Sequence, residues 1–339
     1  MKYTISDIAR IVSTVEHQFT EYSIEFASVD TRRIVVGDKT VFFALPGMLH
    51  DGHEFIDAAH DKGVRNFVIS SAAYQGRYQD SNYILVADVL VALQTLATHH
   101  RASFPKLKKI GITGSNGKTI VKEWLYQMLH DRFCIVKSPK SYNSQIGMSL
   151  SLLHIDTTHE LGIFEAGISE VGEMAHHHSM LDPDIGIFTN LGTAHDAGFA
   201  DQEEKAREKM MLFADAQVLI CKGGDPLISA ASNLLTSGAD IIMWGDMPDA
   251  IVTLGKTKIE NGVRNIPLAY EGVETVLRFR HLDLASLENI MQCITVSLHL
   301  GVPLVELQQL IDRVSEMSMR LELTNGIKNS MLINDAYSA

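Results

Sequence analysis

From Lys109 to Thr119 the chain reads K-I-G-I-T-G-S-N-G-K-T. This stretch passes from an apolar run into a glycine turn and then into a helix that we expect to open at about Lys118. Glycines let backbone N–H groups turn toward an anion, and a helix N-terminus adds partial positive charge. The stretch therefore predicts a phosphate loop for ATP, in which Lys118 reaches the outer phosphates and Thr119 ligates magnesium.

The spacing of this loop departs from the general G-x-x-x-x-G-K-[ST] form. Ile112 stands where the first glycine would be, and Gly114 replaces it. A glycine-rich turn without a ligand is the alternative, but the strand, both glycines, the lysine and the threonine coincide. The candidates for nucleotide contact are Gly114, Ser115, Asn116, Gly117, Lys118 and Thr119.

Apolar, β-rich runs alternate with helical patterns along most of the chain. This alternation predicts an α/β fold, with a small N-terminal α/β domain followed by a phosphate-loop domain that has a mainly parallel sheet. The runs read as buried strands are 41–45, 66–70, 83–87, 109–113, 161–167, 184–190 and 217–222. A helix over about 88–101 and a Lys-rich turn place a domain boundary near residue 105. We expect domains at 1–105 and 106–318, with the start of a third at 319–339.

Composition limits the class of protein. The chain has 339 residues, of which 46% are hydrophobic and 21% charged, so it should fold as more than one domain. The formal charge of -12 argues against a protein that coats nucleic acid. Three cysteines without a C-x-x-C pair suggest neither a disulfide framework nor a zinc site, and favour a reducing cytoplasm. The sequence contains no run of about 18 apolar residues, so it predicts no membrane span.

Two further features invite a metal interpretation. Glu165 ends the apolar run L-G-I-F-E, where many phosphate-loop enzymes place a carboxylate that steadies magnesium. A Glu that caps Gly172 or a nearby helix is the alternative. The run 176–178 is three histidines, but consecutive helical residues do not share a face, so we expect a solvated surface there.

Taken together, several motifs resemble the Mur ligases of peptidoglycan synthesis, and they occur in that family's order. They are T-G-S-N-G-K-T at Thr113, N-S-Q-I-G at Asn143, F-E-A-G-I-S at Phe164 and T-N-L-G-T-A-H at Thr189. The first domain resembles the MurF type, which joins D-alanyl-D-alanine to UDP-N-acetylmuramoyl-tripeptide. The stretches that carry this likeness are V-D-T-R-R at Val29, G-D-K-T-V-F-F-A-L-P-G at Gly37 and D-G-H-E-F-I at Asp51.

The resemblance implies an enzyme that transfers the γ-phosphoryl group of ATP to a carboxylate, giving an acyl phosphate that an amine attacks. It implies two magnesium sites, one held through Thr119 and Glu165 and the other through His195. Lys209 matches the lysine that relatives carry as a carbamate, for which a partly desolvated amine is the plausible precursor. Lys205 is the rival assignment, and an ordinary exposed Lys209 is the other alternative.

The resemblance also implies ligand contacts beyond the phosphate loop. Asn289 is similar to a residue that faces adenine, Arg320 to one that approaches phosphate, and Asp335 to one near the ATP ribose. For the UDP-sugar substrate the candidates are Asp30, Thr31, Arg32, Asp51, Gly52, His53 and Asn143. Arg32 suits a diphosphate. A turn and a helix cap would also account for the residues around Asp51.

The resemblance implies that the first domain binds the UDP end of the muramoyl substrate, the second binds ATP, and a third closes over ATP. We expect this chain to stop inside that third domain, and some relatives carry an alanine racemase beyond it. The alternatives are a sister ligase, a folate polyglutamate ligase, a phosphate-loop kinase or NTPase, and a regulatory nucleotide-binding module. The D-G-H-E-F-I motif favours the MurF type.

Overall fold

The computed structural model of this protein describes residues 1–13, 19–47, 50–193, 196–233, 235, 238–315, 322–325 and 330–334. Its helices are α1 Ile5–Val12, α2 Ile56–Asp61, α3 Val89–Ala102, α4 Lys118–Leu129, α5 Gln145–Leu152, α6 Glu173–Leu181, α7 Gln202–Met210, α8 Pro226–Ser232, α9 Leu284–His299 and α10 Leu307–Ile311. The first strands are β1 Tyr3–Thr4, β2 Ser23–Ile24, β3 Phe26–Ser28, β4 Thr40–Phe43, β5 Asn66–Ile69, β6 Asn82–Leu85, β7 Lys108–Thr113, β8 Ile135–Lys137 and β9 Leu161–Glu165. The later strands are β10 Ile185–Phe188, β11 Val218–Lys222, β12 Asp240–Gly245, β13 Val252–Leu254, β14 Lys258–Glu260, β15 Val263–Tyr270, β16 Val273–Phe279, β17 Glu322–Asn325 and β18 Met331–Asn334.

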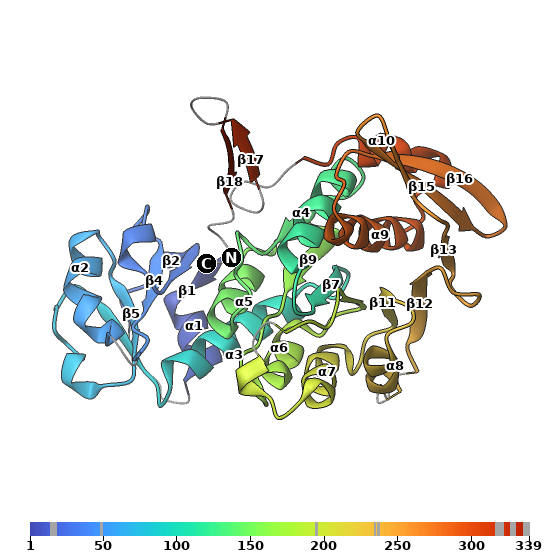
Figure 1. Ribbon diagram of the computed structural model, residues 1–339. Coiled ribbons are helices and arrows are strands. Elements are labelled where there is room, and N and C mark those ends of the chain that lie inside the picture. The colour runs from blue at the N-terminus through green and yellow to red at the C-terminus, as the bar shows by residue number, and fades with distance from the viewer. Residues whose placement is uncertain are drawn as a thin grey trace.

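A four-stranded parallel sheet in the order β3-β4-β5-β6 forms the N-terminal part. The central strands β4 and β5 are buried along their whole length, because both of their faces are covered. Phe42 and Phe67 point to the face that packs with Ile56 of α2, whereas Val41 and Phe43 point to the face covered by α1 and α3. In Figure 1 this sheet lies at one end of the molecule, coloured blue.

The larger, ten-stranded sheet has β7 near its middle. Its order is β14-β15-β13-β12-β11-β10-β7-β9-β8, with β16 paired to β15. The strands from β8 to β13 run parallel, and β14, β15 and β16 add an antiparallel extension at one edge. The carboxyl ends of β7, β9 and β10 therefore meet at one edge of the sheet, where ligands bind in open α/β folds.

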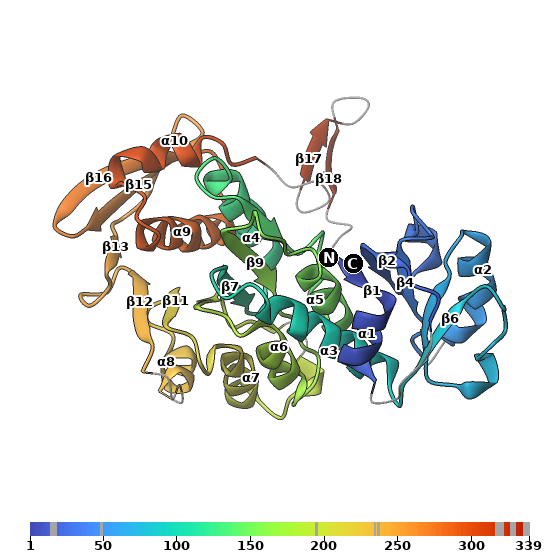
Figure 2. The ribbon, with the colours of Figure 1, turned by 180° about the vertical axis from the view of Figure 1, so that it is seen from behind.

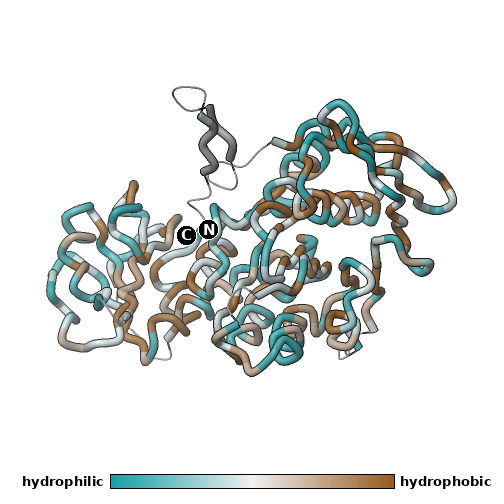
Figure 3. The backbone as a smooth tube through the Cα atoms, viewed as in Figure 1, coloured by the Kyte–Doolittle hydropathy of each residue, from teal (hydrophilic) through white to brown (hydrophobic). Residues whose placement is uncertain are grey.

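Alternating side chains along these strands build two cores. Ile110, Ile163 and Ile187 pack under α4 and α9, while Phe164 and Phe188 point to the opposite face, with α5, α6 and α7. Figures 1 and 2 show α4 and α9 together on one side of the sheet and α6 and α7 on the other. In Figure 3 the apolar residues, in brown, concentrate along the strands, and α7 is mostly hydrophilic.

Helix α3 joins the two sheets. It packs against α1 on one side and against α5 and α6 on the other. From its last turn, His100 Nε2 donates to the Ile155 carbonyl at 2.9 Å, and Arg101 Nε donates to the Met180 carbonyl at 3.0 Å. The boundary predicted near residue 105 falls in the turn between α3 and β7, and the division into domains at 105 and 318 stays a prediction.

The predicted α/β class with mainly parallel sheets is confirmed. Each strand expected from an apolar run is present, with its ends within two residues of the predicted bounds. Within the described ranges, no helix is long and apolar enough to cross a membrane.

Candidate functional site

The loop between β7 and α4 has a backbone that only glycine adopts without strain at two positions. Gly114 has φ 139° and Gly117 has φ 83°. A Cβ at Gly114 would lie 2.1 Å from Thr189 Oγ1, and one at Gly117 would lie 2.2 Å from Asn289 Oδ1. The glycines therefore provide both the turn and the close approach of two neighbouring segments.

The segment after β10 braces this loop. Gly192 N–H donates to Ser115 Oγ at 2.9 Å, and Ser115 Oγ donates to the Gly192 carbonyl at 3.0 Å. Asn116 N–H donates to Asn190 Oδ1 at 3.1 Å, and Thr189 Oγ1 donates to the Asn116 carbonyl at 2.5 Å. The side chain of Ser115 is thus directed to its neighbouring segment, and the loop is held in shape by residues about 75 positions away.

Lys118 opens α4, as expected. Its Nζ donates to the carbonyl oxygens of Gly114 at 2.8 Å and Ser115 at 3.2 Å, so the ammonium lies over the loop at the helix N-terminus. Both the helix end and the ammonium attract anions at this place.

Thr119 and Glu165 come together across the edge of the sheet. The parallel pairing of β7 with β9 sets Glu165 beside Ile112, and Thr119 Oγ1 donates to Glu165 Oε2 at 2.8 Å. Thr119 Oγ1 also lies 3.0 Å from Ser141 Oγ. These hard oxygen donors fit magnesium, which binds proteins through one or two carboxylates and takes its other ligands from phosphates and water. No group of three His, Cys, Asp or Glu side chains forms a metal cluster within the described chain.

Sequence reasoning missed Lys122, the next lysine of α4. Its Nζ lies 2.8 Å from Glu165 Oε1, and both side chains are 0% exposed. The alternative in which Glu165 caps Gly172 is wrong: Glu208 Oε1 accepts from Gly172 N at 2.8 Å and from Met174 N at 3.0 Å. No local signal in the sequence indicates this contact, because it requires β9 to lie beside β7.

Lys209 reaches the same loop from α7. Its side chain is 1% exposed, and its Nζ lies 3.4 Å from the Gly114 carbonyl oxygen. Burial, and then the nearby charges of Lys118 and Lys205, lower the pKa of Lys209 to about 7. The alternative of an exposed Lys209 is therefore wrong.

The rival lysine, Lys205, has a different environment. It is buried, and its Nζ donates to Asp196 Oδ1 at 2.6 Å and to the Gly192 carbonyl at 2.5 Å. The hydrogen bond from Lys205 lowers the pKa of Asp196. Lys205 Nζ is therefore already engaged by a carboxylate and a backbone carbonyl.

Three predicted site residues, His195, Arg320 and Asp335, lie outside the described residues. Asn289 is buried in α9 and lies against Gly117, so it contacts the start of α4. The histidine run at 176–178 is not a solvated surface throughout. His177 is 1% exposed, its Nε2 lies 3.1 Å from the Gly167 carbonyl, and burial lowers its pKa to about 4.

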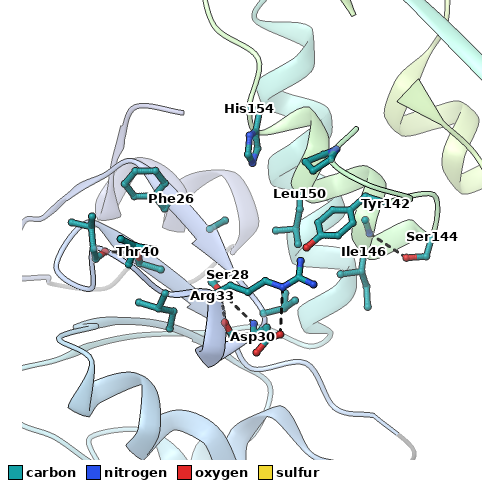
Figure 4. Close-up of a pocket in the computed structure, with 17 residues that line it drawn as sticks. Phe26, Ser28, Asp30, Arg33, Thr40, Tyr142, Ser144, Ile146, Leu150 and His154 are labelled. Atoms are coloured by element: carbon teal, nitrogen blue, oxygen red, sulfur yellow. Dashed lines mark hydrogen bonds and ion pairs between the residues drawn. The ribbon is translucent and has the colours of Figure 1, made fainter. Parts of the chain in front are cut away.

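A pocket of about 540 Å³ lies between the N-terminal sheet and α5. Its lining includes Asp30 and Arg33 from one side and Tyr142, Ile146 and Leu150 from the other (Figure 4). The Arg33 guanidinium lies 5.1 Å from the centre of the Tyr142 ring. The pocket thus joins residues more than 100 positions apart in the sequence.

Among the predicted substrate residues, Asp30 lines this pocket, but Arg32 does not. Arg32 is exposed and makes a two-point ion pair with Asp30, in which Nε and the terminal nitrogen each lie 2.9 Å from a carboxylate oxygen. Thr31 begins the short 3-10 helix Thr31–Arg33, which Asp30 caps. The second arginine of the pair, Arg33, is the cation that sequence reasoning missed.

Asp51, Gly52 and His53 form a turn outside the lining of the pocket, and of the three only His53 is buried. Asp51 caps the 3-10 helix Gly52–Phe55, and its Oδ1 lies 2.6 Å from His53 Nδ1. His53 Nε2 accepts from Ser70 N–H at 3.0 Å, so Nδ1 carries the proton and donates to Asp51. This arrangement is the turn and cap that was the alternative.

Asn143 lies between the two sites. Its carbonyl accepts from Gly167 N at 2.8 Å, and a Cβ at Gly167 would lie 3.0 Å from Asn143 Cγ. The neighbouring residues Tyr142 and Ser144 line the pocket. Asn143 therefore links the end of β9 to the pocket wall.

A parallel sheet whose central strand runs through a glycine loop into a lysine- and threonine-led helix defines a phosphate-loop protein of the α/β class. The family model of the Mur ligase middle domain matches residues 112–296, more than half of the chain, and the chain belongs to the Mur ligase family.

Individual relatives agree with this assignment. The chain is 30% identical to UDP-N-acetylmuramoyl-tripeptide--D-alanyl-D-alanine ligase of Treponema pallidum; the match covers 85% of this chain and 62% of that protein. Among solved structures, MurF of Acinetobacter baumannii superimposes with a TM-score of 0.86 at 22% identity, covering 99% of this chain and 73% of that chain. MurF ligase of Thermotoga maritima in complex with ADP gives 0.77 at 22% identity, covering 91% of this chain and 70% of that chain. The structural matches show the shared fold.

Proposed function

We propose that this protein is part of an ATP-dependent ligase that adds D-alanyl-D-alanine to UDP-N-acetylmuramoyl-tripeptide. The observation that carries the proposal is the convergence of Lys118, Thr119, Glu165 and Lys209 on one glycine loop. A simple nucleotide switch does not need the buried lysine of α7, whereas the relative from Treponema pallidum is named as such a ligase.

The phosphate loop is the proposed ATP site. Backbone N–H groups at the start of α4 and the Lys118 ammonium would offset the charge of the β- and γ-phosphates. The Thermotoga maritima structure is described as a complex with ADP, which supports a nucleotide as the ligand of this chain. Asn289 packs against Gly117 of this loop, and we propose that it contacts the bound nucleotide there.

Thr119 Oγ1 and Glu165 Oε2, which lie 2.8 Å apart, would hold one magnesium ion. When bound, the ion would neutralise charge on the phosphoryl oxygens during transfer. Lys209 is proposed to be carbamoylated: its neutral amine attacks carbon dioxide, a C–N bond forms, and one proton leaves. Its buried position and its pKa of about 7 support a reactive neutral amine. A second magnesium site with His195 remains part of the proposal.

The 540 Å³ pocket is the proposed site of the muramoyl substrate. Arg33 supplies a cation for the diphosphate, and the apolar walls from Phe26 and Ile34 suit a base or sugar face. The pocket is linked through Asn143 to Gly167, two residues after Glu165, so the substrate would extend toward the phosphate loop.

In the proposed reaction, an oxygen of the tripeptide carboxylate attacks the γ-phosphorus and ADP leaves. The amine of D-alanyl-D-alanine then attacks the acyl carbon, loses a proton and expels inorganic phosphate. The role of Lys118 is to keep the negatively charged carboxylate and triphosphate close enough to react. A cytoplasmic location and a third domain that closes over ATP belong to this proposal.

The test is ADP release by the natural protein that carries this chain, with each of ATP, magnesium, the muramoyl tripeptide and the dipeptide omitted in turn. Turnover that needs all four and disappears in Lys118→Ala supports the proposal. ATP hydrolysis that ignores the muramoyl substrate would favour an NTPase instead. Turnover only with another amino acid, or with a folate acceptor, would favour a sister ligase.

A further inference from the structure

Lys122 is a fully buried cation that the proposed reaction does not use. It follows Lys118 by one turn of α4, and its side chain is 0% exposed. Its Nζ donates to the Ser138 carbonyl at 2.8 Å and to the Lys140 carbonyl, and lies 2.8 Å from Glu165 Oε1. A buried ammonium is costly unless it is paired and hydrogen-bonded, and here both conditions are met.

The two oxygens of Glu165 have separate partners. Oε2 accepts the hydrogen bond of Thr119, whereas Oε1 is paired with the Lys122 ammonium and, within the described residues, accepts no hydrogen bond of good geometry. Glu123 also lies 3.2 Å from Lys122, but Glu123 is paired with Lys137 at 2.5 Å. The Lys122 charge is therefore directed mainly at Glu165.

Two ammonium groups face one carboxylate at the loop. Lys118 lies within hydrogen-bond reach of the Gly114 carbonyl, and Lys122 balances the buried Glu165. Such a site attracts an anion and repels a bare divalent cation. A triphosphate with its metal brings its own negative charge and changes this balance.

We propose that Lys122 is a resident counter-ion of Glu165 that keeps the site from binding divalent metal alone, so that metal is taken up together with the nucleotide. This inference deepens the proposed function and rests on its magnesium site. The same ammonium holds the Ser138 and Lys140 carbonyls, next to Pro139 of the pocket wall, so it also fixes the carboxylate relative to that wall.

The experiment uses Mn²⁺ alone as the probe, at pH 8, with free Mn²⁺ measured by electron paramagnetic resonance. Lys122→Met leaves Glu165 without its cation, and Mn²⁺ should bind at least about tenfold more tightly than to the unsubstituted protein. The double variant Lys122→Met with Glu165→Gln should lose this gain. Lys137→Met, which removes another lysine that contacts Glu123, is the matched control and should behave as the unsubstituted protein.

A folded Lys122→Met protein with no gain in Mn²⁺ affinity would overturn the proposal, as would a gain that survives Glu165→Gln. If Lys122→Met does not fold, Lys122→Gln keeps a donor for the Ser138 carbonyl and carries the same expectation. The unsubstituted protein gives an independent check, because Mn²⁺ binding as tight without ATP as with it would also contradict the proposal. Since the assay needs no muramoyl substrate, failure of the ligase assay and failure of this inference are distinguishable.

Discussion

Lys209 Nζ lies 3.4 Å from the carbonyl oxygen of Gly114, although 95 positions separate the two residues. The contact brings a buried amine from α7 to the phosphate loop, away from bulk water. Burial has a chemical consequence, because it favours the neutral amine that reacts with carbon dioxide.

The first prediction concerns the pH dependence of carbamoylation. Because the pKa of Lys209 is lowered to about 7, the neutral fraction rises roughly tenfold from pH 6 to pH 8. Protein that has first lost its carbamate in carbon dioxide-free buffer should regain activity when dissolved carbon dioxide is restored. At a fixed concentration of carbon dioxide, the rate of this recovery should rise by the same factor. Carbon-13 magnetic resonance should place the carbamate on Lys209, and Lys209→Met should show neither signal nor recovery. A carbamate signal that persists in Lys209→Met would assign the modification to another lysine.

The second prediction concerns stability in carbon dioxide-free buffer. The folded pKa of Lys209, about 7, is below the ordinary value of 10.5, so the unfolded chain binds more protons between these values. The destabilisation that comes from burying the protonated Lys209 is largest below pH 7 and disappears toward pH 10.5. Relative to Lys209→Met, the free energy of unfolding should therefore rise with pH, by at most about 1.4 kcal/mol per unit. Denaturant unfolding at several pH values measures the difference, and a flat difference would show that Lys209 is not desolvated.

The third prediction concerns the phosphate loop. Gly117→Ala places a methyl group at φ 83° and 2.2 Å from Asn289 Oδ1, so ATP affinity should fall about tenfold or more. Gly172→Ala is the matched control, since Gly172 has φ 92° at the start of α6 but nothing within 4 Å. Calorimetric titration with ATP should separate the two variants. Equal losses would mean that the loss at Gly117 does not depend on the approach of Asn289.

The fourth prediction separates the two arginines beside Asp30. Arg33→Ala should raise the KM for the muramoyl substrate about tenfold while leaving the KM for ATP nearly unchanged. Arg32→Ala should change either constant by less than about twofold, because this side chain is exposed and lies outside the pocket lining. If Arg32→Ala raises the KM for the muramoyl substrate more than Arg33→Ala does, Arg32 would be the ligand of the diphosphate.

The fifth prediction concerns His53. Its ring links Asp51 to Ser70 N–H inside the N-terminal domain, so His53→Ala should lower the free energy of unfolding by about 2 kcal/mol. The KM for the muramoyl substrate should stay within about twofold at a temperature where the variant is folded. A large change in KM without a change in stability would instead make His53 a substrate residue.

Much of the fold could be predicted because local patterns agree with it. The apolar runs gave the parallel strands, and the stretch ending in Lys118 and Thr119 gave the loop and the start of α4. These signals are local: strand burial, glycine turns and helix starts depend on neighbouring residues.

The remaining features depend on partners distant in sequence. Nothing near Lys122 indicates that it faces Glu165, because that contact requires β9 to lie beside β7. Arg32 and Arg33 are equivalent in sequence, and only the direction of a 3-10 helix decides which lines the pocket. Helical spacing predicts a surface position for His177. In the structure His177 Nε2 contacts the carbonyl of Gly167, a residue that follows another strand, and this contact cannot be read from the neighbouring sequence.

The most direct test of the proposed ligase follows the oxygen atoms of the muramoyl tripeptide. With its reacting carboxylate labelled with oxygen-18, and with ATP and D-alanyl-D-alanine present, one labelled oxygen should appear in inorganic phosphate for each product molecule. This result is expected because an acyl phosphate shares that oxygen between carbon and phosphorus. Phosphate that carries only oxygen from water, with no ligated product, would contradict the account.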